Sequence, residues 1–311
     1  GVEPAPVVEV ASALHELEVE WAPAAGAAVE SRGVSREFLG HLGTVTVDAL
    51  DRHTEGSALV FVPGAREVDH VVADLRSRLA GIDVVGLSGA MSAREQDHAL
   101  SDPGNVRRVI VSTAVAESSL TVPGVRLVVD SGLSREPRLD RGRGMTGLVT
   151  VRESRASAVQ RAGRAARLGP GVAVRCLRAQ DWAGMNADPT PEVDHADLVA
   201  SLLSLAVWGS PRGEGMALPT PLPQDRVAAA EEELRDLGAV DAEGRITARG
   251  RHLATFPLDP RLARALTDGA AIIGSRRCAE IAAMLGLEDG QVDFVGQWRQ
   301  LRSGRHPEAA M

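Results

Sequence analysis

Short strand-like runs alternate with helical segments between residues 58 and 178, and this alternation restricts the fold more than any other feature of the chain. One intervening segment, from Val68 to Leu79, repeats apolar residues at helical spacing. Another begins with Ser92 and Glu95, the pattern of a capping box. Strands that alternate with helices predict a doubly wound α/β fold with a parallel sheet. The expected strands lie at 58–62, 83–87, 109–112, 127–130 and 171–177.

Polar or turn-forming residues follow three of these strands, and ligands of such sheets bind beyond the carboxyl ends of strands. The three segments are Pro63–Gly64, Ser112–Thr113 and 130–132. Hydroxyl groups there suit contacts with phosphate oxygens, which position a nucleic-acid strand without reading its bases. The alternative is that Ser112 and Thr113 only satisfy backbone groups of their own turn.

The segment 160–171, QRAGRAARLGPG, concentrates arginine among small residues. Interpreted as a helix that begins near Ser154, it places Gln160, Arg164 and Arg167 at positions i, i+4 and i+7, on one face. One amide and two guanidinium groups on a face suit polyphosphate, because arginine presents planar, bidentate donors. The alternative is an ordinary helix with a solvated basic face.

Charge is distributed unevenly along the chain. The net charge of −8 argues against indiscriminate nucleic-acid binding, yet residues 134–168 hold nine arginines and only three acids. A basic stripe on an acidic protein is typical of a phosphate-binding surface. The 311 residues contain no lysine, so they cannot include a GxxxxGK[ST] phosphate loop. Phosphates that meet Arg164 must therefore be held by another lobe.

The segment from 179 to 257 has a different character, with prolines that delimit its parts. We expect helices at 197–208 and 224–237, a short hairpin or wing at 241–247, and a helix that ends before Pro257. Helices followed by a small wing resemble a winged helix. The helix at 224–237 is acidic, which disfavours insertion into a nucleic-acid groove. We expect further helices within residues 261–311.

Several protein classes are excluded or disfavoured. There is no apolar run of about 18 residues, so no membrane span is predicted. The first residues lack the pattern of a signal peptide, and the absence of an initiator Met suggests a piece of a longer chain. The two cysteines, Cys176 and Cys278, predict neither a disulfide framework nor a metal site and fit the reducing cytoplasm.

A series of motifs, in order, resembles the DEAH/RHA group of superfamily 2 helicases. QRAGRAAR resembles motif VI, and SRASAVQRAGRAARLGPGV is most similar to the bacterial HrpB branch. LRDLGAVDAEGRITARGRHLATFPLDP resembles the winged-helix segment of these helicases. The remaining matches are LVFVPGAREV at 59–68 (motif IV), LSGAMSAREQ at 87–96, STAVAESSLTVPGV at 112–125 (motif V) and VVDSG at 128–132.

This resemblance implies an α/β fold: a RecA-like parallel-sheet lobe, then a mostly α winged-helix domain and the start of a helical bundle. The implied divisions are 1–50 as a lead-in from a missing first RecA-like lobe, 51–178 as the second RecA-like lobe, 179–257 as the winged-helix domain, and 258–311 as the start of a ratchet-like, HA2-type domain. A β-hairpin is expected between 134 and 151, and in the family it separates strands. The alternative there is a flexible loop.

The resemblance also implies roles for particular residues. Gln160, Arg164 and Arg167 match the residues that reach the γ-phosphate of ATP, and Glu117 joins them in binding the cofactor. Pro123 stands where many members have an aspartate that holds the ribose, so that contact is expected to be absent. The residues expected to contact nucleic acid are Pro63, Gly64, Ser112, Thr113, Ser118, Arg141 and Arg143.

The function expected from this resemblance is that of a fragment of an ATP-dependent RNA helicase, a hydrolase. ATP and Mg²⁺ are bound mainly by the first lobe, so the fragment alone is expected to be inactive. Its expected partners are RNA, possibly DNA, and the first lobe of the same protein, with no membrane. The alternative is a non-enzymatic winged-helix regulator that binds nucleic acid tightly without ATP.

Overall fold

The chain forms two compact units, here described separately. Unit 1 comprises Gly1–Pro137 and Gly147–Thr190, and unit 2 comprises Arg138–Thr146 and Pro191–Met311. The predicted domain boundaries at 50, 178 and 257 remain predictions. The computed structural model describes residues 6, 8, 15–31, 33–89, 91–101, 104, 106–117, 122–140, 145–286 and 294–303.

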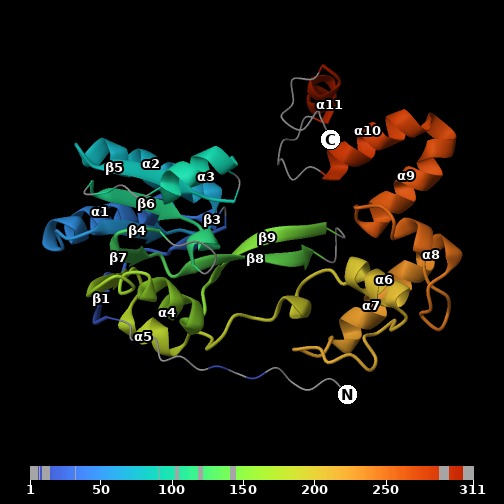
Figure 1. Ribbon diagram of the computed structural model, residues 1–311, viewed down its shortest axis with the longest axis horizontal. Helices are drawn as coiled ribbons and strands as arrows, with labels where there is room; N and C mark the ends of the chain where they lie inside the picture. The colour runs from blue at the N-terminus through green and yellow to red at the C-terminus, as the bar shows by residue number, and fades with distance from the viewer. Residues whose placement is uncertain are drawn as a thin grey trace. The chain divides into compact units, whose positions relative to one another are not determined.

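Unit 1 is built on a six-stranded sheet with the order β1-β10-β7-β4-β6-β5 (Figure 1). Every neighbouring pair in this sheet runs parallel, which confirms the predicted parallel arrangement. The edge strand β1 lies within residues 1–50, where the sequence analysis expected only a lead-in, and it pairs with β10 from Leu17 opposite Gly171 onward. The strands are β1 (Leu17–Trp21), β4 (Ser57–Phe61), β5 (Asp83–Leu87), β6 (Arg108–Ser112), β7 (Val125–Asp130) and β10 (Gly171–Arg175).

Helices cover both faces of this sheet, and successive residues of β4 point to opposite sides. Ala58 and Val60 pack with α1 (Arg36–Arg52) and α2 (Ala65–Arg78) in one buried cluster. Leu59 and Phe61 belong to the other cluster, with residues of α3 (Ala93–Leu100), the short helix η1 (Ala114–Ala116) and α4 (Arg155–Gly163). A further helix, α5 (Ala179–Ala183), follows β10. The strands are thus buried on both sides, which explains their continuous apolar runs.

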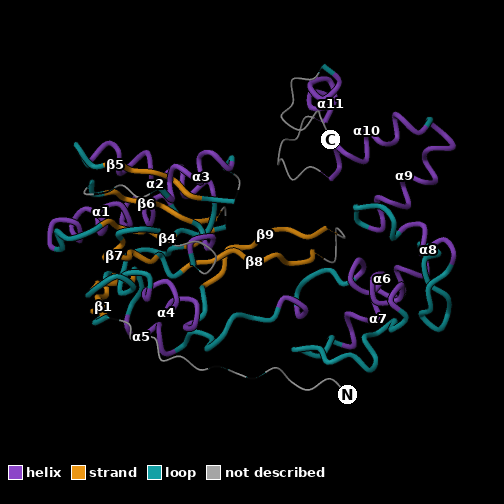
Figure 2. The backbone as a smooth tube through the Cα atoms, viewed as in Figure 1, coloured by secondary structure: helices purple, strands orange, loops and turns teal. Residues whose placement is uncertain are grey.

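Two local predictions are confirmed. The side chain of Ser92 accepts from the backbone N–H of Glu95, and the Ser92 N–H donates to the Glu95 carboxylate over 2.9 Å, so the capping box forms at α3. The hairpin also forms, because β8 (Leu133–Asp140) and β9 (Met145–Arg152) make a two-stranded sheet (Figure 2). Arg141 and Arg143 lie outside the described residues. A second small sheet joins β2 (Val29–Glu30) and β3 (Gly33–Val34).

The predicted helix through the arginine-rich segment is wrong in its extent. The helix α4 ends at Gly163, and Arg164 is its C-cap. The N–H groups of Arg164 and Ala165 each donate to the carbonyl three residues earlier, over 3.0 Å, which tightens the chain beyond α-helical geometry. Gly171 then packs against the backbone of Ala165, where a Cβ would overlap it.

Unit 2 begins with the short helix η2 (Glu192–Asp194) and continues with α6 (Val199–Trp208), α7 (Gln224–Asp236) and α8 (Ala248–Leu253). A buried cluster that includes Leu202, Leu234 and Leu253 joins these three helices. Val240 and Ile246 form a single antiparallel bridge between α7 and α8, so the predicted helices and short wing are confirmed. Beyond them lie α9 (Pro260–Ile273), α10 (Ser275–Gly286) and α11 (Phe294–Arg302).

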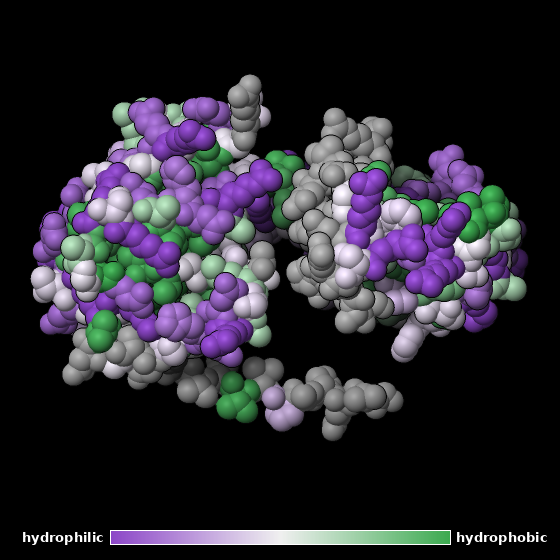
Figure 3. Space-filling view, turned by 90° about the horizontal axis from the view of Figure 1, so that it is seen from above, coloured by the Kyte–Doolittle hydropathy of each residue, from purple (hydrophilic) through white to green (hydrophobic). Residues whose placement is uncertain are grey.

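Hydrophilic residues cover much of the surface seen in Figure 3, with smaller groups of hydrophobic residues among them. Within the described part of the chain, every helix is too short or too polar to cross a membrane.

Candidate active site at the carboxyl edge of the sheet

Three predicted contact segments emerge from one edge of the sheet. The last residue of β4, Phe61, is in register with Ser112 of β6 on one side and with Asp130 of β7 on the other. The segments Pro63–Gly64, Ser112–Thr113 and 130–132 therefore begin side by side, as predicted. The chain continues from β4 toward β5 on one side of the sheet and from β7 toward β10 on the other, and open α/β sheets bind ligands where the strand order reverses in this way.

The hydroxyl groups at the end of β6 differ in what they contact. The Ser112 side chain is fully buried and donates to the carbonyl oxygen of Thr113 over 2.9 Å. For Ser112, this contact fits the alternative in which the hydroxyl only satisfies a backbone group of its own turn. The half-buried Thr113 hydroxyl makes no hydrogen bond with the described residues. Only the Thr113 hydroxyl is thus available to a ligand as the structure stands. Ser118 lies outside the described residues.

Gly64 lies directly beneath an ion pair that links the hairpin to α2. Arg135 of β8 contacts Glu67 of α2 over 3.1 Å. A Cβ on Gly64 would overlap the ends of both side chains, so a larger residue there would displace this ion pair. This packing holds the Pro63–Gly64 turn against the first strand of the hairpin.

The arginine-rich segment reaches the same edge from α4. The helix begins at Ser154, whose hydroxyl accepts from the Ser157 N–H over 3.1 Å. Gln160 and Arg167 are exposed, whereas Arg164 as a whole is 5% exposed. The Nε of Arg164 donates to the carbonyl oxygen of Glu117 over 2.8 Å, and its Nη2 donates to the same oxygen. The Arg164 guanidinium is therefore held by the loop that follows β6.

Arg164 lies in a field that favours an anion. Burial lowers its pKa most, the positive charge of Arg167 lowers it further, and Glu117 opposes both effects. The two guanidinium groups are thus close enough to repel each other, and arginine stays protonated in proteins. A bound anion would relieve this repulsion and compensate the desolvation of Arg164.

Arg161, which was not among the predicted site residues, is the most buried charge at this edge, with 1% of its residue surface exposed. Its Nε contacts the Glu117 carboxylate over 2.9 Å, and its Nη1 contacts Asp130 over 3.1 Å and Glu153 over 2.6 Å. Its guanidinium carbon lies 5.0 Å from the centre of the Phe61 ring. Burial alone would lower the Arg161 pKa, but the charges of the three carboxylates raise it well above its usual value.

Among the carboxylates around Arg161, Glu153 has a strongly shifted pKa. Burial, and then the negative charge of Asp130, raise the pKa of Glu153 well above its usual range, although Arg161 opposes this shift. Asp130 also accepts from the Gly132 N–H over 3.0 Å. Glu117, the predicted cofactor residue, uses its carboxylate to bind Arg161 and to accept from the Ser157 hydroxyl over 2.5 Å. Its predicted contact with the cofactor remains a prediction.

The sequence contains one signal that points to Arg161. Ala158, Ala162 and Ala165 are all buried and mark the inner side of α4. Arg161 is three residues after Ala158 and adjacent to Ala162, so helical spacing places it on that inner side. Gln160, in the same turn, is exposed. The match to motif VI gave the γ-phosphate role to Gln160 and no role to Arg161.

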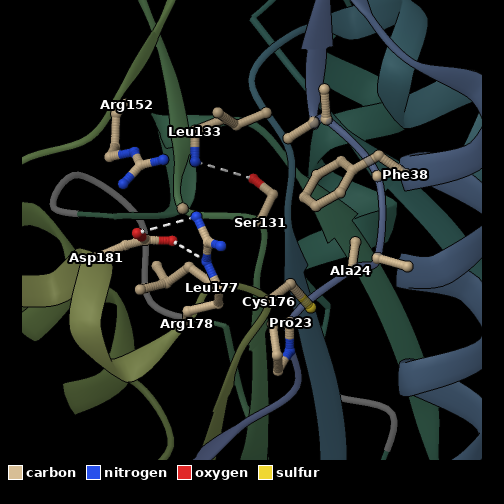
Figure 4. A pocket seen from close by; sticks show the side chains of 15 residues that line it. Pro23, Ala24, Phe38, Ser131, Leu133, Arg152, Cys176, Leu177, Arg178 and Asp181 are labelled. Carbon is tan, nitrogen blue, oxygen red and sulfur yellow. Dashed lines mark hydrogen bonds and ion pairs between the residues drawn. The ribbon is translucent and has the colours of Figure 1, made fainter.

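A cavity of about 330 Å³ lies beside these residues, at the ends of β7 and β10 (Figure 4). Phe38 and Cys176 contribute apolar surface, and burial raises the pKa of the Cys176 thiol well above its usual range. Arg178 and Asp181 form an ion pair of 2.9 Å at one side. Arg152, at the end of β9, lies on the same side. No group of three or more His, Cys, Asp or Glu residues in the described ranges could hold a metal ion.

Two family models match the chain. The helicase conserved C-terminal domain matches residues 42–169, and the winged-helix part of the helicase associated domain (HA2) matches residues 230–258. These ranges include the arginine-rich segment and the wing, respectively.

Individual relatives agree with these matches. The ATP-dependent RNA helicase HrpB of Escherichia coli (strain K12) is 38% identical over 237 residues, which cover 75% of this chain and 29% of that protein. A probable ATP-dependent RNA helicase DHX35 homolog of Caenorhabditis elegans is 33% identical over 265 residues, 82% of this chain and 36% of that protein. A crystal structure of the Escherichia coli DEAH/RHA helicase HrpB aligns with a TM-score of 0.80 and 32% identity, over 92% of this chain and 37% of that one. The chain thus spans about a third of the length of these relatives.

Proposed function

This chain belongs to the DEAH/RHA, HrpB-like helicases, of which it is a C-terminal part, and we propose that it supplies one half of the ATPase site of an ATP-dependent RNA helicase. The expected family and its RecA-like α/β fold are thereby confirmed. The other half of the site, with the phosphate loop, comes from a first RecA-like lobe that precedes this chain. The chain alone is inactive in this proposal, because it contains no lysine for such a loop.

The observation that carries the proposal is the placement of Arg164. Its guanidinium is held on the Glu117 carbonyl and is repelled by Arg167, while Gln160 and Arg167 are exposed beside it. Planar, charged donors in this arrangement fit the oxygens of a polyphosphate. When lobes close over ATP, Arg164 and Arg167 stabilise the negative charge that develops on the transferred phosphoryl group, and Gln160 orients it. ATP supplies that phosphoryl group, and its Mg²⁺ is held mainly by the first lobe.

The same edge of the sheet binds the nucleic-acid backbone in this proposal. The Thr113 hydroxyl and the Pro63–Gly64 turn supply contacts from motifs V and IV, together with Ser118, whereas the buried Ser112 hydroxyl is held by the Thr113 carbonyl oxygen and only supports the turn. Arg141 and Arg143, between the strands of the hairpin, neutralise phosphates. RNA is the proposed substrate, with DNA as an alternative, and the cytoplasm is the proposed location.

The competing function is a winged-helix regulator without catalysis. The acidic residues of α7 argue against it, because Glu231 binds Arg212 over 2.7 Å and Glu233 binds Arg261 within unit 2. A helix whose acids pair with its own domain suits packing better than insertion into a groove. Fluorescence anisotropy of a labelled duplex distinguishes the two: tight binding by this chain that does not respond to ATP would favour the regulator.

The proposal is tested by RNA-stimulated ATP hydrolysis in the protein that joins this chain to its first lobe, with Arg164→Ala. We expect kcat to fall by about 10³-fold or more while nucleotide binding is retained. Arg78→Ala is the matched control, because Arg78 lies at the end of α2 and is partly exposed in a 2.9 Å pair with Asp74. Equal turnover in the Arg164 variant and the control would remove the proposed role of Arg164. Turnover by the purified chain alone would contradict its inactivity.

A further inference from the structure

The guanidinium group of Arg161 contacts both ends of the hairpin. Its Nη1 donates to the carbonyl oxygen of Leu133, the first residue of β8, over 3.1 Å. The same nitrogen pairs over 2.6 Å with Glu153, which directly follows the last residue of β9. The Glu153 N–H also donates to the Gly132 carbonyl over 3.1 Å, which closes the base of the hairpin.

The same guanidinium continues toward Arg164. The Nε of Arg161 pairs with the Glu117 carboxylate over 2.9 Å, and the Glu117 carbonyl oxygen accepts from Arg164 over 2.8 Å. A continuous path of contacts therefore runs Glu153–Arg161–Glu117–Arg164. Its first two steps join side chains directly, and the last passes through the Glu117 residue from its carboxylate to its backbone carbonyl.

This path is stiff as well as continuous. Arg161 is fully buried, and Asp130 and the Phe61 ring hold it from two further directions. A buried ion pair is attenuated far less by solvent than an exposed one, so displacing one partner without the other costs several kcal/mol. A movement of the hairpin base therefore moves Arg161 as well, because solvent does not replace the buried contact between them.

We propose that Glu153 and Arg161 are positioning residues that couple the hairpin to the arginine that meets the phosphoryl group. This inference rests on the proposed function, because it assigns Arg164 to hydrolysis and the hairpin to nucleic acid. A nucleic-acid strand that displaces the hairpin shifts Glu153, then Arg161 and Glu117, and so changes the position of Arg164. Neither Glu153 nor Arg161 touches the nucleotide in this scheme.

The test uses Glu153→Met and Glu153→Gln in the protein that includes the first lobe. Methionine matches the length of glutamate but offers the Arg161 guanidinium no oxygen, whereas glutamine keeps a carbonyl oxygen that can face Arg161. We expect the ratio of RNA-stimulated to basal kcat to fall by about fivefold or more in the methionine variant, with KM for ATP unchanged. The glutamine variant restores the ratio.

Two further variants separate coupling from folding. Ser157→Ala removes one hydrogen bond of the Glu117 carboxylate and is expected to lower the same ratio to a smaller extent. Glu231→Met breaks the partly exposed pair with Arg212 in unit 2 and leaves the ratio at its wild-type value. A wild-type ratio in both Glu153→Met and Ser157→Ala, or an equal loss in Glu153→Gln and Glu153→Met, would overturn the inference.

The Arg164→Ala variant distinguishes a failure of the proposed coupling from a failure of the proposed function. If it abolishes hydrolysis while the Glu153 variants keep the wild-type ratio, only the coupling is refuted. If it leaves hydrolysis intact, the proposed function itself fails.

Discussion

Replacing Arg161 with methionine is expected to be among the most destabilising single changes in unit 1. Arg161 is the shared partner of Glu117, Asp130 and Glu153, and the side chains of Asp130 and Glu153 are 2% and 1% exposed. Removing one partner of a buried ion pair leaves uncompensated charge and costs about 3–5 kcal/mol. With a denaturant slope of about 2 kcal/mol per M, the urea midpoint falls by about 2 M.

This loss of stability depends on pH in a definite direction. Without Arg161, burial and mutual repulsion raise the pKa values of the remaining carboxyls in the folded state above their unfolded values. The folded state then binds more protons, so stability is present at pH below the unfolded pKa and is lost as pH rises through the folded pKa. The pKa of Glu153 is already raised in the wild type, so the effect adds to an existing trend. The destabilisation at pH 8 is therefore larger than at pH 5.

The measurement is urea unfolding followed by tryptophan fluorescence. Replacing Trp208 and Trp298 with phenylalanine leaves only Trp21 and Trp182, both in unit 1, whose rings lie 5.9 Å apart. The exposed pair of Arg78 gives the control, since Arg78→Met is expected to cost about 1 kcal/mol or less. A cost for Arg161→Met that equals the control, or that does not change between pH 5 and pH 8, would refute the reasoning.

Three other predictions concern single elements. Gly171→Ala forces a Cβ into the Ala165 backbone and should cost about 2–3 kcal/mol, whereas Gly163→Ala meets open space and should leave the urea midpoint unchanged or slightly higher. The Ser92 hydroxyl lowers the pKa of Glu95 at the start of α3, so this contribution is present above the unfolded pKa and lost as pH falls through the folded one. The protection of α3 amides from exchange, measured relative to the unfolded chain at the same pH, should therefore fall at acidic pH in the wild type but not in Glu95→Gln. Arg261 pairs with Asp197, Glu233 and Asp259. Arg261→Ala should lower the free energy of unfolding of unit 2 by about 2 kcal/mol. The thermal midpoint of unit 2 should therefore fall, while that of unit 1 should not change.

Local patterns were enough to predict most elements of this protein. The strand at 83–87, the capping box at Ser92 and the helix at 224–237 depend on residues within one or two turns of each other, and the structure has them where they were expected. The extent of α4 was overestimated, because arginine spacing indicates a face but not the residue at which a helix ends. The tight packing of Gly171 against Ala165 depends on a chain reversal that periodicity does not report.

The sequence by itself determined the parallel α/β class and the order of the motifs, since these follow from residue type and short spacing, and it indicated the arginines that we propose to face a polyphosphate. Tertiary structure decided which charges are buried together. Glu117 and Arg161 are separated by 44 positions, and β1 reaches its place beside β10 through pairing between Leu17 and Gly171. No local pattern encodes such contacts, because the low dielectric that makes the Arg161 cluster strong exists only after both faces of the sheet are covered.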